Sequence, residues 1–177
     1  GAEAGIHGPN WDIEAGGWFG VSAFTFPTAD AASAFVTNID LQANGCMTDP
    51  VTYTTPESEM DLFIDGNGDD AVWNVADNNG SFPGTVPYAD EMTLVIYEQF
   101  ISTNVDSTDY SVTRTELQRF ERHGRTVLAF WLWGEHSGVG FSDAADWEYE
   151  PTEADLDAAA ATIRPLVVER LSLSGLV

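Results

Sequence analysis

The sequence contains no lysine, one cysteine and few cations of any kind. Its 177 residues include six basic side chains, all of them arginine, against 29 Asp and Glu, so that the formal net charge is −23 at pH 7. A chain with so few cations cannot neutralise many phosphates, which argues against nucleic acid and anionic membrane surfaces as partners. The single cysteine, Cys46, excludes an intramolecular disulfide and a zinc site built from several cysteines.

Long apolar segments are also absent. No run reaches the roughly 18 apolar residues that a helix needs to cross a bilayer, so the sequence predicts no membrane insertion. Hydrophobic residues nevertheless make up 44% of the chain and aromatic residues 12%, which is enough for a packed core. The length suits one domain. We expect residues 18–177 to form a single α+β domain, and the aperiodic, Gly-rich residues 1–17 to form a loosely structured N-terminal segment.

The first half of the chain alternates between strand and helix signals. Residues 18–26 (WFGVSAFTF) have the aromatic and β-branched content of a strand. A helix should follow, capped by Thr28 at its start and ended near Asn44 and Gly45. Residues 51–55 form a further short strand candidate. The turn formers and prolines of residues 77–90 predict a loop.

The second half predicts three long strands, at about 91–102, 110–122 and 125–135. The turns between them are too short for crossover helices, so the strands should form an antiparallel meander. The third strand is apolar on both faces, which is typical of a central strand covered on both sides. A final helix at 152–171 has Thr152 as its cap and an apolar stripe at steps of three and four residues.

These elements together predict an α+β fold. Its antiparallel sheet contains a meander of long strands and packs with two main helices, one after the first strand and one at the C-terminus.

Two tryptophans of the third long strand, Trp131 and Trp133, project from the same face. Neighbouring indoles can stack on a sugar ring or an aromatic ligand, and an arginine can add a polar clamp. The pattern therefore indicates a ligand cleft lined by Trp131, Trp133, Arg119 and Tyr97. The alternative interpretation is that both indoles pack in the core.

Four of the six arginines fall within residues 114–125. One interpretation is that they pair with local carboxylates such as Glu116 and Glu121. The other is an anion-binding patch, since arginine makes charge-assisted hydrogen bonds to carboxylate and phosphate groups.

Asp65, Asn67 and Asp69 occupy the first three ligand positions of a calcium loop. The sixth position is Asp70 rather than glycine, and the twelfth is Ala76 rather than a bidentate glutamate. A weak calcium site and a polar hairpin tip both fit this pattern. No other cofactor is indicated.

No catalytic constellation stands out. The histidines at positions 7, 123 and 136 lack metal-ligand spacing, and there is no G-x-S-x-G nucleophile elbow. Paired carboxylates could hydrolyse a glycoside, but among 29 acids the sequence selects no pair. The sequence favours a non-enzymatic domain that binds a small molecule. The alternatives are a secreted hydrolase with paired carboxylates and a calcium-stabilised surface module.

Two segments carry a family likeness. Residues 24–46 (FTFPTADAASAFVTNIDLQANGC) combine a strand, a helix with paired alanines and a cysteine. Residues 120–133 (FERHGRTVLAFWLW) form a basic turn that feeds an apolar strand, before the Ala-rich closing helix. The chain thereby resembles the PknH-like extracellular sensor domain of actinobacteria and related lipoproteins. The resemblance implies a non-catalytic sensor domain with a sheet-lined cleft for a small ligand. It also implies a location outside the cytoplasm, within a receptor or a lipoprotein that is anchored through a segment outside this sequence.

Overall fold

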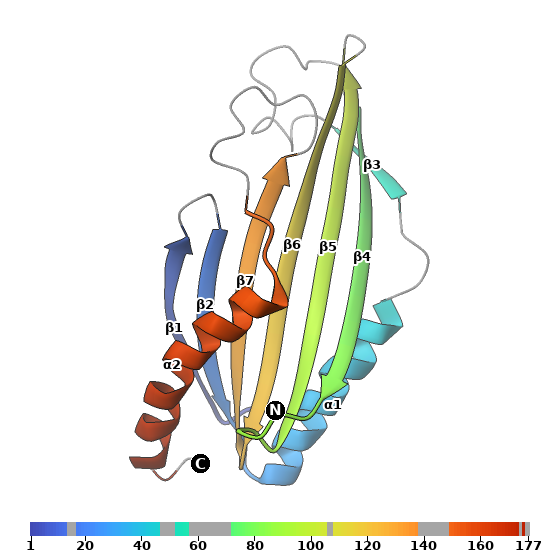
Figure 1. The fold of residues 1–177 in the computed structure, drawn as a ribbon. Helices are drawn as coiled ribbons and strands as arrows, with labels where there is room; N and C mark the ends of the chain where they lie inside the picture. Colours follow the sequence, from blue (N-terminus) through green and yellow to red (C-terminus); the bar gives the residue numbers. More distant parts are fainter. Residues whose placement is uncertain are drawn as a thin grey trace.

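The computed structural model describes residues 1–13, 17–46, 52–56, 72–105, 108–137, 149–173 and 175. In this part of the chain a sheet of seven strands has the order β1-β2-β7-β6-β5-β4-β3, and every neighbouring pair is antiparallel (Figure 1). The strands are β1 (Ala4–Ile13), β2 (Gly17–Thr25), β3 (Thr52–Pro56), β4 (Val72–Gly84), β5 (Glu91–Val105), β6 (Thr108–His123) and β7 (Thr126–Ser137). The helices are α1 (Ala29–Cys46) and α2 (Glu153–Leu173).

The predicted fold class is confirmed. Strands β5, β6 and β7 form the expected meander. The two-residue turn of Gly124 and Arg125 joins β6 to β7. Gly124 has a positive φ of 59°, a conformation that glycine adopts at little cost. Strand β7 is central, as its two apolar faces predicted, because β2 pairs along its other edge.

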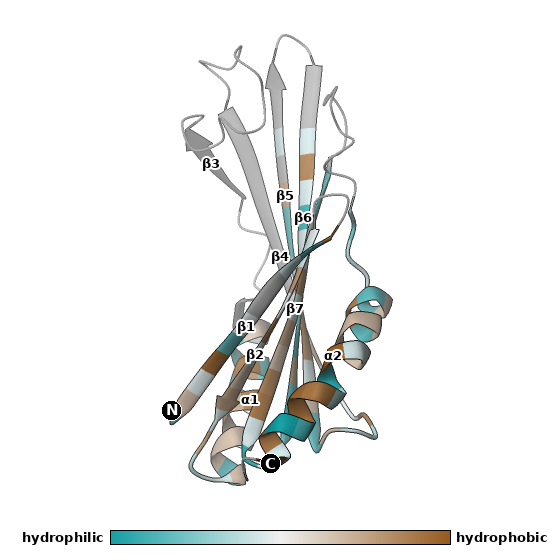
Figure 2. Cartoon of the chain, turned by 90° about the vertical axis from the view of Figure 1, so that its left-hand side faces the viewer, coloured by the Kyte–Doolittle hydropathy of each residue, from teal (hydrophilic) through white to brown (hydrophobic). Residues whose placement is uncertain are grey.

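The two helices cover opposite faces of the sheet (Figure 2). We call these the α1 face and the α2 face. Both helices lie over the half of the sheet nearest the β6–β7 turn, whereas β5 and β6 extend beyond them toward the opposite end (Figure 1).

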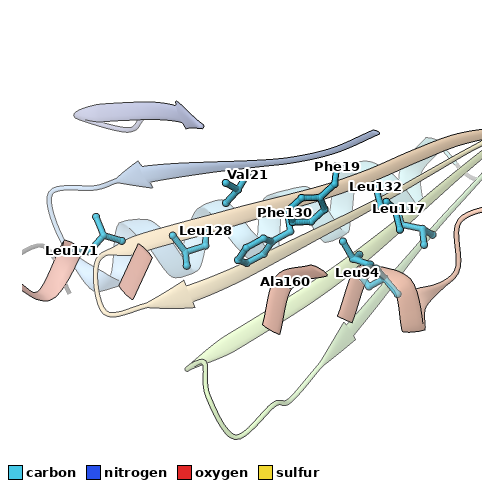
Figure 3. Close-up of a cluster of buried hydrophobic side chains, with 10 residues drawn as sticks. Phe19, Val21, Leu94, Leu117, Leu128, Phe130, Leu132, Ala160 and Leu171 are labelled. Carbon is cyan, nitrogen blue, oxygen red and sulfur yellow. The ribbon is translucent and has the colours of Figure 1, made fainter. Parts of the chain in front are cut away.

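The larger core lies between the sheet and α2 (Figure 3). Strands β2, β5, β6 and β7 contribute alternate residues, as expected where one face is buried. From α2 come residues spaced along one side of the helix, among them Leu156, Ala160 and Leu171. The buried members from the strands are Phe19, Val21, Leu94, Leu117, Leu128, Phe130 and Leu132.

A smaller core fixes α1 to the other face. Phe26, Ala32, Val36 and Val127 are buried together. Phe35 lies between Phe26 and Phe120, with ring centroids 5.0 Å and 6.3 Å apart. This aromatic packing sets the position of α1 over β6 and β5.

The expectation of a loosely structured segment at residues 1–17 is wrong for Ala4–Ile13. These residues form β1, which pairs with β2 along the sheet edge. Ile6 and Trp11 are exposed, and a register shift separates His7 from Asn10. Both faces of this edge strand are exposed to solvent, so its residues need not alternate between apolar and polar. Its sequence therefore lacks the periodicity that indicates a strand.

The predicted loop at residues 77–90 is also corrected, because β4 continues to Gly84. Asn79, Gly80 and Pro83 all lie opposite residues of β5. Strand β3 pairs with β4 only as far as Ala76, so within the described residues Pro83 lies where β4 has a single partner strand. Proline is tolerated at such an edge because no second strand requires its missing N–H.

Candidate functional site

An open groove lies between the second half of α1 and the sheet. Its volume is about 460 Å³, within the range of small-molecule sites. Helix α1 forms one wall with three residues that share a helix face, and strands β5 and β6 form the floor. The lining residues are Ile39, Gln42, Ala43, Val95, Tyr97, Glu116, Gln118 and Phe120.

Strand register sets the order of side chains on the groove floor. Tyr97 of β5 lies opposite Glu116 of β6, and Val95 lies opposite Gln118. The Gln118 side-chain amide donates a hydrogen bond of 2.9 Å to Glu116 Oε1. The floor is thus apolar toward Phe120 and polar toward Tyr97 and Glu116.

A chain of hydrogen bonds continues from Tyr97 away from α1. Gln99 Nε2 donates to the Tyr97 hydroxyl at 3.1 Å, and Gln99 Oε1 accepts from Arg114 at 3.3 Å. Arg114 Nε in turn donates to Glu135 Oε1 at 2.5 Å. These contacts link β5, β6 and β7 and hold the polar end of the groove in place.

Of the predicted ligand residues, Tyr97 lines the groove, and Trp131 and Trp133 lie beside it. Trp131 pairs with Gln118 and Trp133 with Glu116, so both indoles are on the α1 face, one strand further from the helix. Both are half-buried, and Trp133 stacks against Trp18 of β2 with ring centroids 6.4 Å apart. They form a border to the groove, while its floor comes from β5 and β6.

Arg119 does not belong to this site. It pairs with Phe130, which places it on the α2 face, where it is 1% exposed. Its guanidinium contacts Asp157 and lies 3.6 Å from Glu153, both on α2. Arg119 therefore ties α2 to the sheet on the side opposite the groove.

The arginines of residues 114–125 all face carboxylates, mostly from other elements. Arg122 contacts Asp90 and Glu91, each at 3.1 Å, and Arg125 lies 3.7 Å from Glu3. The pairing interpretation therefore describes Arg114, Arg119, Arg122 and Arg125, although their partners are not the neighbouring Glu116 and Glu121. The described contacts do not support an anion-binding patch.

Glu121 has its own partner on α2. Arg164 donates two hydrogen bonds of 2.6 Å to the Glu121 carboxylate, and the Tyr88 ring lies 3.8 Å from the guanidinium carbon. Burial disfavours the charged form of Glu121, but contacts with His123 and Arg164 outweigh it, so the pKa of Glu121 lies below its ordinary value of 4.5. Local sequence pattern does not indicate this pair, because its members are 43 residues apart.

The predicted calcium ligands Asp65, Asn67 and Asp69 lie outside the described residues. Within the described part, no group of three or more His, Cys, Asp and Glu side chains is arranged to hold a metal ion. Neither α1 nor α2 is long and apolar enough to cross a membrane.

Sequence reasoning missed most of the groove. It treated Glu116 as a counter-charge for arginines and did not single out Gln118, Val95 or the residues from α1. Alternation along β6 carried a usable signal, because Glu116, Gln118 and Phe120 share one face of the strand. The contribution of Ile39, Gln42 and Ala43 depends on where α1 crosses the sheet, and local pattern does not specify that.

No protein-family model, no curated protein and no solved structure matches this chain. The groove itself is therefore the basis for assigning a function.

Proposed function

We propose that this chain is a non-catalytic domain that binds a small molecule in the groove between α1, β5 and β6. The observation that carries the proposal is the groove lining, in which an apolar floor leads to converging polar groups. Small-molecule sites combine these features, since apolar surface supplies affinity and a few fixed polar groups supply orientation. Tyr97, Glu116 and Gln118 are the polar groups, and Val95, Ile39 and Phe120 are the apolar ones.

The same lining favours binding over hydrolysis. A glycosidase of the paired-carboxylate type needs two acids on either side of the scissile bond. Among the described residues that line the groove, Glu116 is the one carboxylate. The nearby Glu135 is held by Arg114 at 2.5 Å, which commits it to an ion pair.

The proposal includes a location outside the cytoplasm, in a sensor or lipoprotein. Its support is the resemblance of residues 24–46 and 120–133 to the PknH-like sensor domain. Labelling of intact and lysed cells of the source organism with an antibody against the domain tests it. Labelling of intact cells is the expected result, and labelling after lysis alone would contradict it.

A variant that fills the groove tests the binding site. Ala43 is half-buried on α1, and a Trp side chain at this position would occupy the space above Val95 and Tyr97. We expect a screen of small aromatic fragments, followed by backbone amide NMR shifts, to give hits at the groove residues. Ala43→Trp should abolish these shifts.

Ala34→Trp is the matched control, because Ala34 is exposed on the same helix and does not line the groove. This variant should bind fragments as the wild type does. Fragments that bind elsewhere, or no fragment binding at all, would contradict the proposed function.

A further inference from the structure

Glu116 lies between two aromatic residues on the α1 face. Across the strands the register runs Trp18, Trp133, Glu116 and Tyr97, each opposite the next. Residues opposite each other in an antiparallel pair have Cβ atoms roughly 4.5–5.5 Å apart and project to the same side. The carboxylate therefore has an aromatic residue on either side, one at the groove floor and one at its border.

The charge of Glu116 is not matched by an arginine within the described residues. Its carboxylate accepts a hydrogen bond of 2.9 Å from Gln118, a neutral donor. Arg114, the nearest arginine along the strand on the same face, donates to Glu135 and Gln99. Arg122 contacts Asp90 and Glu91 at the other end of β6. A half-buried carboxylate with a single neutral donor has unused capacity for a cationic partner.

Aromatic flanks and a carboxylate favour the same kind of ligand. A ligand cation is attracted to the face of an aromatic ring within roughly 6 Å, and more strongly once it is desolvated. A carboxylate adds charge-assisted hydrogen bonds to an ammonium group. The net charge of −23 further attracts cations and repels anions.

We infer that the groove selects an organic cation, with its ammonium group at Glu116 between Tyr97 and Trp133. The apolar part of the ligand lies along Val95 and Ile39 toward Phe120. This inference rests on the proposed function, because it names the ligand class of the same groove. A neutral sugar stacked on Trp131 and Trp133 would not depend on the charge of Glu116, so the two are separable by experiment.

Three probes of similar shape test the inference: 2-phenylethylammonium, 2-phenylethanol and phenylacetate. Titrations at neutral pH, followed by amide NMR shifts of the groove residues, give the affinity of each. The wild type should bind the ammonium probe more tightly than the alcohol by roughly tenfold, the effect of one charge-assisted hydrogen bond, and should bind phenylacetate least. Glu116→Gln should remove the preference for the ammonium probe, so that the ammonium and the alcohol bind with similar affinity.

Glu116→Gln is a mild change, since its amide oxygen still accepts the hydrogen bond from Gln118. Glu98→Gln is the matched control, because it removes the same charge from the exposed opposite face of neighbouring β5 and should retain the preference. Tyr97→Phe and Tyr97→Leu provide a second test. The aromatic variant should keep the ammonium preference, and the aliphatic variant should reduce it.

The outcomes separate the two proposals. Equal binding of ammonium and alcohol to the wild type, or an ammonium preference that survives both Glu116→Gln and Tyr97→Leu, would overturn the cation inference and leave the groove as a binding site. Absence of groove shifts with all three probes and with the fragment screen would overturn the proposed function, and the inference with it.

Discussion

Glu121 and Arg164 form a buried ion pair between β6 and α2. The glutamate is 0% exposed and the arginine 9%, and two hydrogen bonds of 2.6 Å join them. Removing two charges from water is costly, and close, well-paired geometry is required to offset that cost. The pair therefore matters most when it is broken on one side, since the remaining charge stays buried.

Glu121→Gln should lower the free energy of unfolding by about 3–5 kcal/mol at neutral pH, because Arg164 loses its counter-charge. The loss should depend on pH. The folded-state pKa of Glu121 is below 4.5, so its stabilisation is fully present above about pH 4.5 and is lost as pH falls through the folded-state pKa. Urea unfolding of both proteins from neutral to acid pH should show the difference between them shrinking below about pH 4.5.

Two variants control this experiment. Glu169→Gln changes the same charge on an exposed position of α2 and should alter stability by less than about 0.5 kcal/mol. The double variant Glu121→Leu with Arg164→Met replaces the pair by apolar side chains and should be far less destabilised than Glu121→Gln. A pH-independent difference between Glu121→Gln and the wild type would contradict the assigned role of the ionised carboxylate.

Side-chain direction explains which site residues were predictable. The two-residue turn between β6 and β7 pairs odd-numbered residues of one strand with even-numbered residues of the other. Trp131 and Trp133 therefore share a face with Gln118 and Glu116, and Arg119 points to the opposite side. Because a tight turn fixes the register, the sequence contained enough to place Arg119 correctly. The position of α1 over the sheet depends on contacts between residues far apart in the sequence, so local pattern could not predict it.

At the scale of elements, segments with strong local periodicity were predictable. β7, with two apolar faces, and both capped helices have such patterns. β1 and the second half of β4 do not, because pairing with a neighbouring strand, more than side-chain burial, holds them in place. Asn79, Gly80 and Pro83 are turn formers that occupy a strand, which shows tertiary pairing overriding local propensity.

The two helices begin with caps of different completeness. In α1, the Ala31 amide donates to Thr28 Oγ1 at 3.1 Å. In α2, the Asp155 amide donates to Thr152 Oγ1 at 3.2 Å, and the Thr152 amide donates back to Asp155 Oδ2 at 3.0 Å. The Thr152 hydroxyl also donates to Asp155 Oδ2 at 2.6 Å. The cap of α2 is therefore reciprocal, as in a capping box.

Removal of each cap should have a graded effect. Thr28→Ala should lower the free energy of unfolding by about 1 kcal/mol. Thr152→Ala should lower it by more, up to about 2 kcal/mol, because the Thr152 hydroxyl also donates a hydrogen bond to Asp155 Oδ2. Chemical denaturation of both variants measures the difference. Thr162→Ala, at an exposed position inside α2, controls for loss of a threonine side chain within the helix. An equal or larger loss for Thr28→Ala would contradict the importance of the reciprocal cap.

At the scale of the whole molecule, two electrostatic effects oppose each other. Ion pairs tie α2 and the strand ends to the sheet, and salt weakens such pairs where they are exposed. Repulsion among the many carboxylates acts against the folded state, and salt weakens that too. Six arginines cannot neutralise 29 acidic side chains, so repulsion should dominate.

Added sodium chloride should therefore stabilise the protein. Between about 0.01 M and about 1 M salt the screening length falls from roughly 30 Å to roughly 3 Å, which suppresses long-range repulsion. Buried pairs such as Glu121 with Arg164 are screened far less and retain their contribution. The melting temperature, followed by circular dichroism, should rise by roughly 2–4 °C for each kcal/mol gained.

A variant with Asp12, Glu150 and Glu169 changed to amides distinguishes screening from other effects of salt. All three positions are exposed, and none contributes to the ion pairs of the described residues, so the variant should melt higher than the wild type in low salt and gain less from added salt. Calcium chloride at matched ionic strength should act as sodium chloride does if screening is the whole effect, and a larger rise would indicate a site such as residues 65–70. A melting temperature that falls with sodium chloride would mean that the ion pairs outweigh the repulsion. The arginine contacts, more than the net charge, would then govern the response of this molecule to its ionic surroundings.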